Sequence, residues 1–321
     1  MGPILLSAVL GGLLATFAWA AHRRRRRLLA TVAEVALPVA SLALGNARKV
    51  IVYLPPGYGH DDRRYPVLYV NDGQECAALG LRETLAQLYA AGRIRPLITV
   101  AIPTNAGRLH EYGTAIAVSR GLGTRAAAYR DFVTQELMPL IDARFHTAAE
   151  AAFLGVSLGG LSAFDIARAC PERFQTVGVM SGSFWWWAAE DETAIDPGQR
   201  IAHALVRRER PPNQRYWFQA GTRDEVCDRD GNGVIDAIQD TTELIDELLA
   251  ARTPPDRIRY VEVTGGRHDY DTWAKVLPDF LLWAYGRRGS VNATGFKEPD
   301  YGQSASSVVY LHQSQSITGP A

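Results

Sequence analysis

A serine occupies the centre of a motif that is typical of exposed nucleophiles. Residues 155–159 have the pattern G-x-S-x-G, and they lie between a strand-like apolar run over 151–154 and a helix-like run over 158–169. A serine nucleophile needs a sharp strand-to-helix turn, flanked by small residues so that the backbone passes closely. The motif therefore predicts that Ser157 is a nucleophile. The alternative is a tight glycine turn between two core elements.

A serine nucleophile needs a base and an acid that orients the base. Of the seven histidines, His268 is the best placed, because it follows the last predicted strand and precedes the last predicted helix. The alternative is that His268 only caps that helix. Asp224 follows another predicted strand and is our choice of acid, with Glu225 and Asp228 left open. The order serine, acid, histidine is that of α/β-hydrolases.

The oxyanion that forms on an attacked carbonyl needs two hydrogen-bond donors. The backbone N–H of Leu158 follows the serine at the start of the predicted helix, where the helix dipole also favours negative charge. A second donor is expected in the loop after the third strand, residues 71–74, and the backbone N–H of Gln74 is our choice. An ordinary polar turn is the alternative.

Two further segments are candidates for the lining of a substrate cleft. The first is the long polar loop over 103–123, because loops of that length in compact domains are often functional. The second is a tryptophan run over 185–187 that follows a predicted strand, although a helix start packed on the sheet explains it as well. The candidate residues are Arg108, Glu111, Tyr112, Trp185 and Trp186.

Predicted strands and helices alternate along the chain. The expected strands cover 32–44, 49–54, 66–70, 97–102, 151–154, 176–180, 216–220 and 258–263. The expected helices cover 81–91, 126–145, 158–169, 237–249 and 272–285. This alternation predicts an α/β fold with a mostly parallel central sheet and helices on both faces. The order serine, acid, histidine makes the α/β-hydrolase fold the expected form of it. The turn signal Gly45-Asn46 predicts that an antiparallel hairpin opens the sheet.

An acidic loop after Asp224 has the spacing of a calcium loop. Asp228, Asp230, Asn232 and Asp236 place oxygen side chains at loop positions 1, 3, 5 and 9, with glycine at position 6. Position 12 is glutamine instead of glutamate, and no helix is expected before the loop. The pattern predicts a structural calcium ion, and a solvated Asp/Gly turn is the alternative. Ester chemistry on a serine requires no cofactor.

Composition and the two ends set the domain organisation. The 321 residues carry 34 Lys+Arg and 34 Asp+Glu, so the chain has no overall bias toward nucleic acid. Residues 4–21 form an uncharged apolar run followed by arginines over 23–27. We expect a membrane-associated segment over 1–30, a catalytic domain over 31–288 and a weakly structured tail over 289–321, in which 308–311 is a lone docking strand.

The side of the membrane is open at this point. The arginine run favours a cytoplasmic domain, whereas a calcium loop favours the outside. A cleaved signal with secretion is the alternative to an anchor, because Ala18-Trp19-Ala20 resembles a cleavage site. Three cysteines make no disulfide framework.

Several of these motifs together resemble the putative esterase family of α/β-hydrolases. The resemblance rests on residues 52–58, 65–69, 72–74, 136–139, 155–160 and 266–269, and it covers about 32–287. The family includes enterochelin-type siderophore esterases, feruloyl esterases, S-formylglutathione hydrolases and mycobacterial mycolyltransferases. The resemblance implies Ser157 as nucleophile and His268 as base, whereas the match of the acid to Asp224 is looser.

The sequence therefore predicts a serine hydrolase of small carboxylic esters that works through an acyl-enzyme. An acyltransferase on the same residues is the alternative in chemistry. A catalytically silent, membrane-tethered binding domain is the alternative of a different class.

Overall fold

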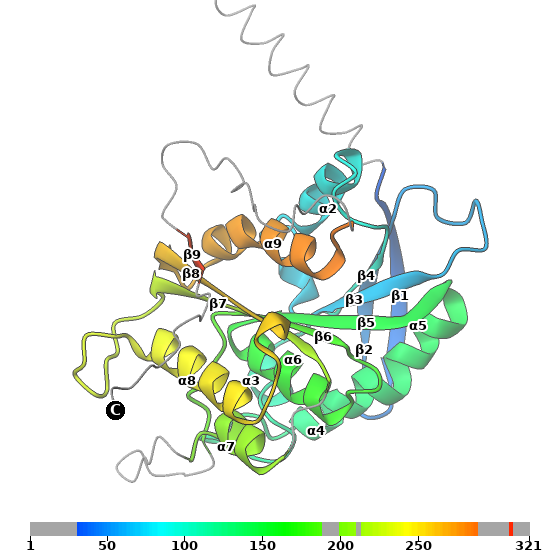
Figure 1. Cartoon of the computed structure of the whole chain (residues 1–321). Coiled ribbons are helices and arrows are strands. Elements are labelled where there is room, and N and C mark those ends of the chain that lie inside the picture. The colour runs from blue at the N-terminus through cyan, green and yellow to red at the C-terminus, as the bar shows by residue number, and fades with distance from the viewer. Residues whose placement is uncertain (1–30, 188–198, 210–212, 288–307, 311–321) are drawn as a thin grey trace, which may run out of the picture.

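The central element of the molecule is a twisted sheet whose strands run in the order β1-β2-β4-β3-β5-β6-β7-β8-β9 (Figure 1). The computed structural model describes residues 31–187, 199–209, 213–287 and 308–310. The strands are β1 (Ala33–Ser41), β2 (Asn46–Leu54), β3 (Tyr65–Val70), β4 (Ile98–Ala101), β5 (Thr147–Val156), β6 (Thr176–Met180), β7 (Arg215–Arg223), β8 (Ile258–Arg267) and β9 (Val308–Tyr310). The strands from β4 to β8 in this order pair in parallel, and the pairs at both ends of the sheet are antiparallel.

Helices cover both faces of the sheet, as the strand–helix alternation predicts (Figure 1). On one face α2 (Leu81–Ala90) and α9 (Tyr270–Tyr285) enclose one hydrophobic core. On the other face a second core is covered by α4 (Ala126–Asp131), α5 (Met138–Arg144), α6 (Ser157–Ala169), α7 (Ile201–Arg208) and α8 (Asp236–Ala250). Strands β3, β4 and β6 are buried along their whole length, which explains why their sequences are nearly continuous apolar runs.

Most of the predicted elements form, and one differs in kind. The hairpin closes between Ser41 and Asn46, and the predicted docking strand in the tail pairs with β8 as β9. The single helix expected over 126–145 is instead α4 and α5 joined by a π-helical stretch, Phe132–Leu137. Pro139 follows this stretch and has no N–H, so a regular α-helix would leave the carbonyl of Gln135 without its donor. The structure also adds two helices that the sequence analysis did not predict, the short α3 (Arg108–Glu111) and α7.

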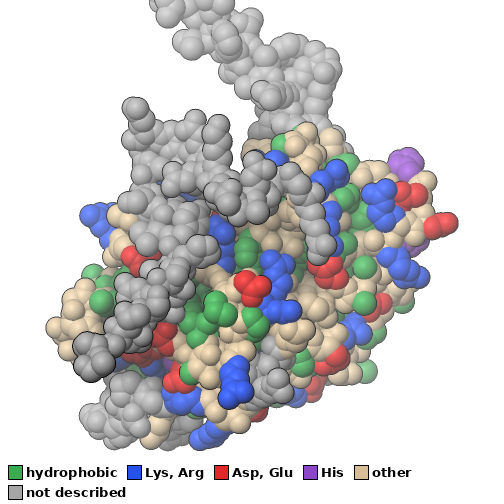
Figure 2. All heavy atoms as spheres, viewed as in Figure 1, with side chains coloured by type: hydrophobic (Ala, Val, Ile, Leu, Met, Phe, Trp, Pro, Cys, Tyr) green, Lys and Arg blue, Asp and Glu red, His purple; other side chains and the backbone are tan. Residues whose placement is uncertain are grey.

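The ends of the chain lie largely outside the described residues. The predicted membrane segment over 1–30 and the tail over 289–321, apart from β9, therefore stay predictions. In the part of the chain that the structure describes, no helix combines the length and the apolar character needed to cross a bilayer. On the face drawn in Figure 2, basic and acidic side chains lie interspersed over the surface.

The parallel strands bring distant polar segments to one edge of the sheet. The carboxyl ends of β3, β5, β7 and β8 precede the oxyanion loop, Ser157, Asp224 and His268, respectively. In open α/β sheets the functional groups gather at this edge. The fold thus places the predicted site residues on neighbouring loops.

Candidate active site

Ser157 lies on a strained turn between β5 and α6. Its φ is +55°, in the left-handed region that non-glycine residues rarely adopt, and α6 begins at this residue. The turn is tight enough that a Cβ on Gly155 would lie 2.1 Å from the carbonyl oxygen of Gly159, and a Cβ on Gly159 would lie 2.8 Å from Asp72 Oδ2. The glycines on either side of Ser157 are therefore required by space, and the segment has the geometry of a nucleophile elbow.

His268 and Asp224 lie beside each other on the loops after β8 and β7. The distance from His268 Nδ1 to Asp224 Oδ1 is 4.0 Å, and the Asp224 side chain is fully buried while that of His268 is 42 % exposed. Asp224 Oδ2 accepts a hydrogen bond of 2.9 Å from the amide of Gly221, whereas Oδ1 has no hydrogen-bond partner among the described residues. Catalytic hydrogen bonds are often long without substrate, so this spacing suits an acid and a base.

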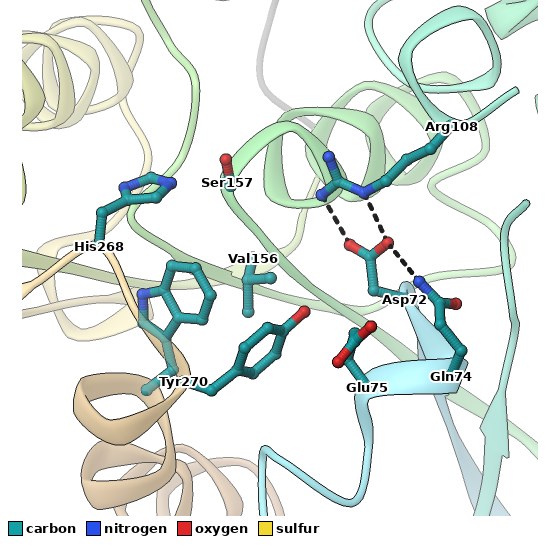
Figure 3. A pocket seen from close by; sticks show the side chains of 9 residues that line it. Asp72, Gln74, Glu75, Arg108, Val156, Ser157, His268 and Tyr270 are labelled. Atoms are coloured by element: carbon teal, nitrogen blue, oxygen red, sulfur yellow. Dashed lines mark hydrogen bonds and ion pairs between the residues drawn. The ribbon is translucent and has the colours of Figure 1, made fainter. Parts of the chain in front are cut away.

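The alternative role of His268, that of a helix cap, belongs to its neighbour. The side chain of Asp269 accepts a hydrogen bond of 2.8 Å from the amide of Thr272 and caps α9. The imidazole of His268 is therefore left to the pocket, and Figure 3 shows it turned toward the hydroxyl of Ser157.

Electrostatics favour the neutral form of the imidazole. Burial lowers the pKa of His268, and the positive charge of Arg108 lowers it further, while the charge of Asp224 acts in the opposite direction. Burial raises the pKa of Asp224, and its hydrogen bond from Gly221 and the charge of His268 offset part of that rise. Since the pKa of His268 lies below its usual value near 6.5, the ring is a neutral proton acceptor at neutral pH.

The two amides predicted as oxyanion donors lie at the start of α6 and in the loop after β3. Leu158 is the second residue of α6, so its amide belongs to the first turn, whose N–H groups have no partner within the helix. Gln74 is the middle residue of a short 3₁₀ helix, η1 (Gly73–Glu75). The amides of both its neighbours donate to carbonyls, whereas no described residue accepts a hydrogen bond from the amide of Gln74.

The side chain of Gln74 is fixed to the loop after β4. Its Oε1 accepts a hydrogen bond of 2.9 Å from the amide of Thr104, and its Nε2 donates to the Thr104 hydroxyl at 3.2 Å. This pairing joins the loop after β3 to the loop after β4, and it leaves the backbone amide of Gln74 free to donate.

An ion pair with the buried carboxylate of Asp72 holds the start of the loop after β3. Asp72 has a φ of +55° and is 3 % exposed, and its carboxylate accepts hydrogen bonds of 2.7 and 2.8 Å from Arg108 (Figure 3). Its backbone amide donates to the hydroxyl of Tyr112 at 2.9 Å. Planar two-point pairing of this kind fixes orientation as well as charge. Asp72 therefore fixes the loop after β3, in which the second oxyanion donor is predicted.

These residues enclose a pocket of about 270 Å³ in front of Ser157. Figure 3 shows the side chains that line it: Asp72, Gln74, Glu75, Arg108, Val156, Ser157, His268, Tyr270 and Trp273. The indole of Trp273 donates a 2.9 Å hydrogen bond to the hydroxyl of Ser181 and meets the ring of His268 edge-on, with 5.1 Å between ring centroids. The pocket thus combines an apolar, aromatic wall with a few polar groups, which is typical of small-molecule sites.

The structure corrects the predicted lining of the cleft. Of the five candidates only Arg108 lines the pocket. Glu111 is fully buried in an ion pair with Arg48, and Tyr112 is fully buried beneath Asp72. Neither side chain can reach a substrate, because Glu111 is paired with Arg48 and the hydroxyl of Tyr112 accepts the hydrogen bond from the amide of Asp72.

The tryptophans likewise lie away from the pocket. Trp186 is fully buried, and its indole donates to the carbonyl of Ala117 at 3.0 Å. Trp185 is half-buried and lies against the guanidinium of Arg120, with 5.4 Å from the guanidinium carbon to the ring centroid. They pack the long loop onto the sheet instead of lining the cleft.

Five lining residues were not singled out from the sequence as contacts of the substrate: Asp72, Glu75, Val156, Tyr270 and Trp273. The first two lie within two residues of Gln74, Val156 precedes Ser157, and the last two follow His268 in the chain. Proximity in sequence to the predicted oxyanion loop, nucleophile and base was the signal that would have found them.

The predicted calcium loop lies exposed after Asp224. The carboxylate of Asp228 accepts hydrogen bonds from the amides of Asn232 and Gly233 at 3.1 and 2.9 Å, and Asp236 Oδ1 accepts one from the amide of Arg229 at 3.0 Å. Arg229 also forms ion pairs with Asp236 and with Asp230, at 3.7 and 3.9 Å. Within the described residues no group of three or more histidine, cysteine, aspartate or glutamate side chains is arranged to hold a metal ion.

Comparisons with known proteins agree with this fold. The family model "Esterase", described as "Putative esterase", matches residues 41–284. The protein YbbA of Bacillus subtilis, itself uncharacterised, is 26% identical over 57% of this chain and 83% of its own length. An endo-1,4-beta-xylanase/feruloyl esterase of Xylanibacter ruminicola is 32% identical over 44% of this chain and 20% of its own.

Solved structures show the same architecture. The enterobactin esterase of Shigella flexneri aligns with a TM-score of 0.60 and 23% identity over 78% of this chain. The alignment spans 58% of that esterase, so this chain matches less than two thirds of it. A ferulic acid esterase aligns with a TM-score of 0.60 and 19% identity over 79% of this chain and 98% of its own. Because the family model matches residues 41–284, most of the chain, this protein belongs to the esterase family, and the solved structures show that it shares their fold.

Proposed function

We propose that the protein hydrolyses small carboxylic esters through a covalent acyl-enzyme on Ser157, with His268 as the base and Asp224 as the acid. In the first step His268 accepts the proton of the Ser157 hydroxyl while Oγ attacks the carbonyl carbon. The carbonyl oxygen becomes an oxyanion that accepts hydrogen bonds from the amides of Leu158 and Gln74.

The tetrahedral adduct then loses its alcohol. His268 returns the proton to the departing alkoxide, and an acyl ester remains on Ser157. In the second half a water molecule gives its proton to His268 and attacks the acyl carbon, and collapse of that adduct releases the carboxylic acid and restores the Ser157 hydroxyl. Asp224 holds the ring and stabilises the imidazolium without itself taking up the proton.

The observation that carries this proposal is a strained serine at the start of α6 that shares one pocket with the imidazole of His268, with the buried carboxylate of Asp224 4.0 Å from that ring. The cheapest test is labelling with a fluorophosphonate probe, followed by a panel of acyl esters. Labelling and ester turnover by the same protein support the proposal, whereas a protein that neither reacts with the probe nor cleaves any ester contradicts it. Transfer of the acyl group to an added alcohol in preference to water would identify the acyltransferase instead.

We further propose that the loop over 228–236 binds calcium as a structural ion. The oxygen side chains at the calcium-loop positions support this. In the described residues these carboxylates face loop amides and Arg229 and are not grouped around one point, so calcium binding requires them to turn toward the ion. An ion that binds only the folded state raises the free energy of unfolding by about 2.7 kcal/mol when its free concentration is a hundred times its Kd. Calcium should therefore raise the melting temperature above that in chelator, and Asp230→Ala should abolish the difference. Identical melting curves for the metal-free protein with and without calcium would reduce the loop to a solvated turn.

We also propose that the apolar run over 4–21 attaches the enzyme to a membrane, with a cleaved signal and secretion as the alternative. Full-length protein that stays with membranes through carbonate extraction supports the anchor. A shortened N-terminus on protein recovered from the host would establish the signal.

A further inference from the structure

The pocket in front of Ser157 contains a carboxylate that no described residue neutralises. Glu75 lines the pocket from the end of η1 and is half-buried. No side-chain hydrogen bond or ion pair joins Glu75 to another residue that the structure describes. The other acidic group of the lining, Asp72, is instead held at two points by Arg108. Of the three lining side chains that carry a permanent charge, two are negative and one is positive, so the pocket has an excess negative charge at Glu75.

Aromatic rings stand next to this carboxylate. Tyr270 and Trp273 line the same pocket, with ring centroids 4.9 Å apart and ring planes at 86°, so they form two perpendicular walls. Figure 3 shows the carboxylate of Glu75 directed toward the hydroxyl end of Tyr270, while the guanidinium of Arg108 is turned to Asp72. The electron-rich faces of tyrosine and tryptophan attract cations, and alkylated ammonium groups above all.

A carboxylate beside two aromatic walls is the chemistry that binds an ammonium group. We propose that Glu75, Tyr270 and Trp273 select ester substrates that carry a positively charged ammonium group close to the ester bond. This inference rests on the proposed function, because the same pocket presents that ester to Ser157. It makes Glu75 a specificity residue, since its charge acts on the substrate and takes no part in proton transfer.

The test uses isosteric pairs of esters that differ only in charge. In one pair acetylcholine, the acetic ester of choline, is compared with the acetic ester in which a tert-butyl group replaces the trimethylammonium group, so the charge lies on the alcohol side. In the other, the para-nitrophenyl ester of γ-trimethylammonio-butyrate is compared with its tert-butyl isostere, so the charge lies on the acyl side. The readout is the ratio of kcat/KM for the cationic ester to that for the neutral ester, in which any general loss of activity cancels.

In at least one pair the wild-type enzyme should prefer the cationic ester by about fivefold, the size typical of a half-exposed ion pair. Glu75→Gln should bring the ratio close to one, and Glu75→Asp should keep most of the preference because it keeps the charge. The preference should also shrink as salt is added. Glu172→Gln is the matched control, because Glu172 is an exposed glutamate in the turn before β6, at the opposite edge of the sheet, and its ratio should equal that of the wild type.

The outcomes separate this inference from the function on which it rests. Equal kcat/KM for both members of both pairs, or a wild-type preference that survives in Glu75→Gln, overturns the role of Glu75 and leaves the esterase mechanism standing. If no ester in either pair, and none in the general panel, is cleaved in a manner that depends on Ser157, the proposed function fails and the inference fails with it.

Discussion

Replacing Ser157 by alanine should reduce kcat for ester hydrolysis by roughly 10⁴- to 10⁶-fold and abolish labelling by a fluorophosphonate probe. Loss of a nucleophile from a serine hydrolase site typically has an effect of this size, because the remaining groups act as a unit with it. The substitution exchanges one small residue for another on a turn with a φ of +55°. Serine and alanine adopt that left-handed conformation at a similar energetic cost. The fold should therefore persist, which a melting curve would check.

A second serine of the same helix provides the control. Ser162 is buried in α6, 2 % exposed, and lies outside the pocket. Ser162→Ala should keep both labelling and turnover. Labelling that persists in Ser157→Ala, or that disappears in Ser162→Ala with the fold intact, would show that the nucleophile has been assigned to the wrong serine.

Replacing His268 by alanine should be as damaging as the loss of Ser157, because no other histidine among the described residues lines the pocket to accept the serine proton. Asp224→Asn should cost less than His268→Ala, with a fall in kcat on the order of 10⁴-fold, since the acid orients the ring without reacting. Glu225→Gln is the matched control for the acid, because Glu225 is the adjacent carboxylate. If Glu225→Gln cripples the enzyme while Asp224→Asn does not, the acid of this site is Glu225.

The pH dependence of kcat/KM tests the assignment of His268 as the base, because the direction of its pKa shift is known. Only the neutral form of His268 accepts a proton, so activity should rise with pH through the pKa of His268 in the free enzyme. Burial and the charge of Arg108 lower that pKa, so the midpoint should lie below the usual value near 6.5. Asp224 acts in the opposite direction and raises it, so Asp224→Asn should move the midpoint to still lower pH while the rate falls. A midpoint above 6.5 in the wild type would contradict the dominant effect of burial, and a midpoint that does not move in Asp224→Asn would contradict the coupling of the two groups.

The positions of the loops follow from patterns that the sequence displays directly. Apolar runs bounded by glycine and proline predicted the strands from β1 to β8, and helical periodicity predicted α2, α6, α8 and α9, because burial against a sheet imposes those patterns locally. The glycines around Ser157 predicted the elbow for a similar reason, since a close backbone approach excludes every side chain there. Exceptions arose where local pattern was ambiguous, as in the π-helical stretch before Pro139 and in α7.

Local sequence patterns were enough to predict the fold class, the nucleophile-type turn and the loops that carry His268 and Asp224, because each depends on residues that are neighbours in the chain. Contacts between distant segments were needed to show which side chains of the loops face the pocket. Glu111 and Arg108 are three residues apart in the same short helix, yet Glu111 is buried against Arg48 from β2 while Arg108 reaches Asp72 at the cleft. Those partners come from distant parts of the chain, so local pattern could not choose between them. For the same reason the unpaired charge of Glu75 emerged only once Arg108 was seen to neutralise Asp72, and not Glu75.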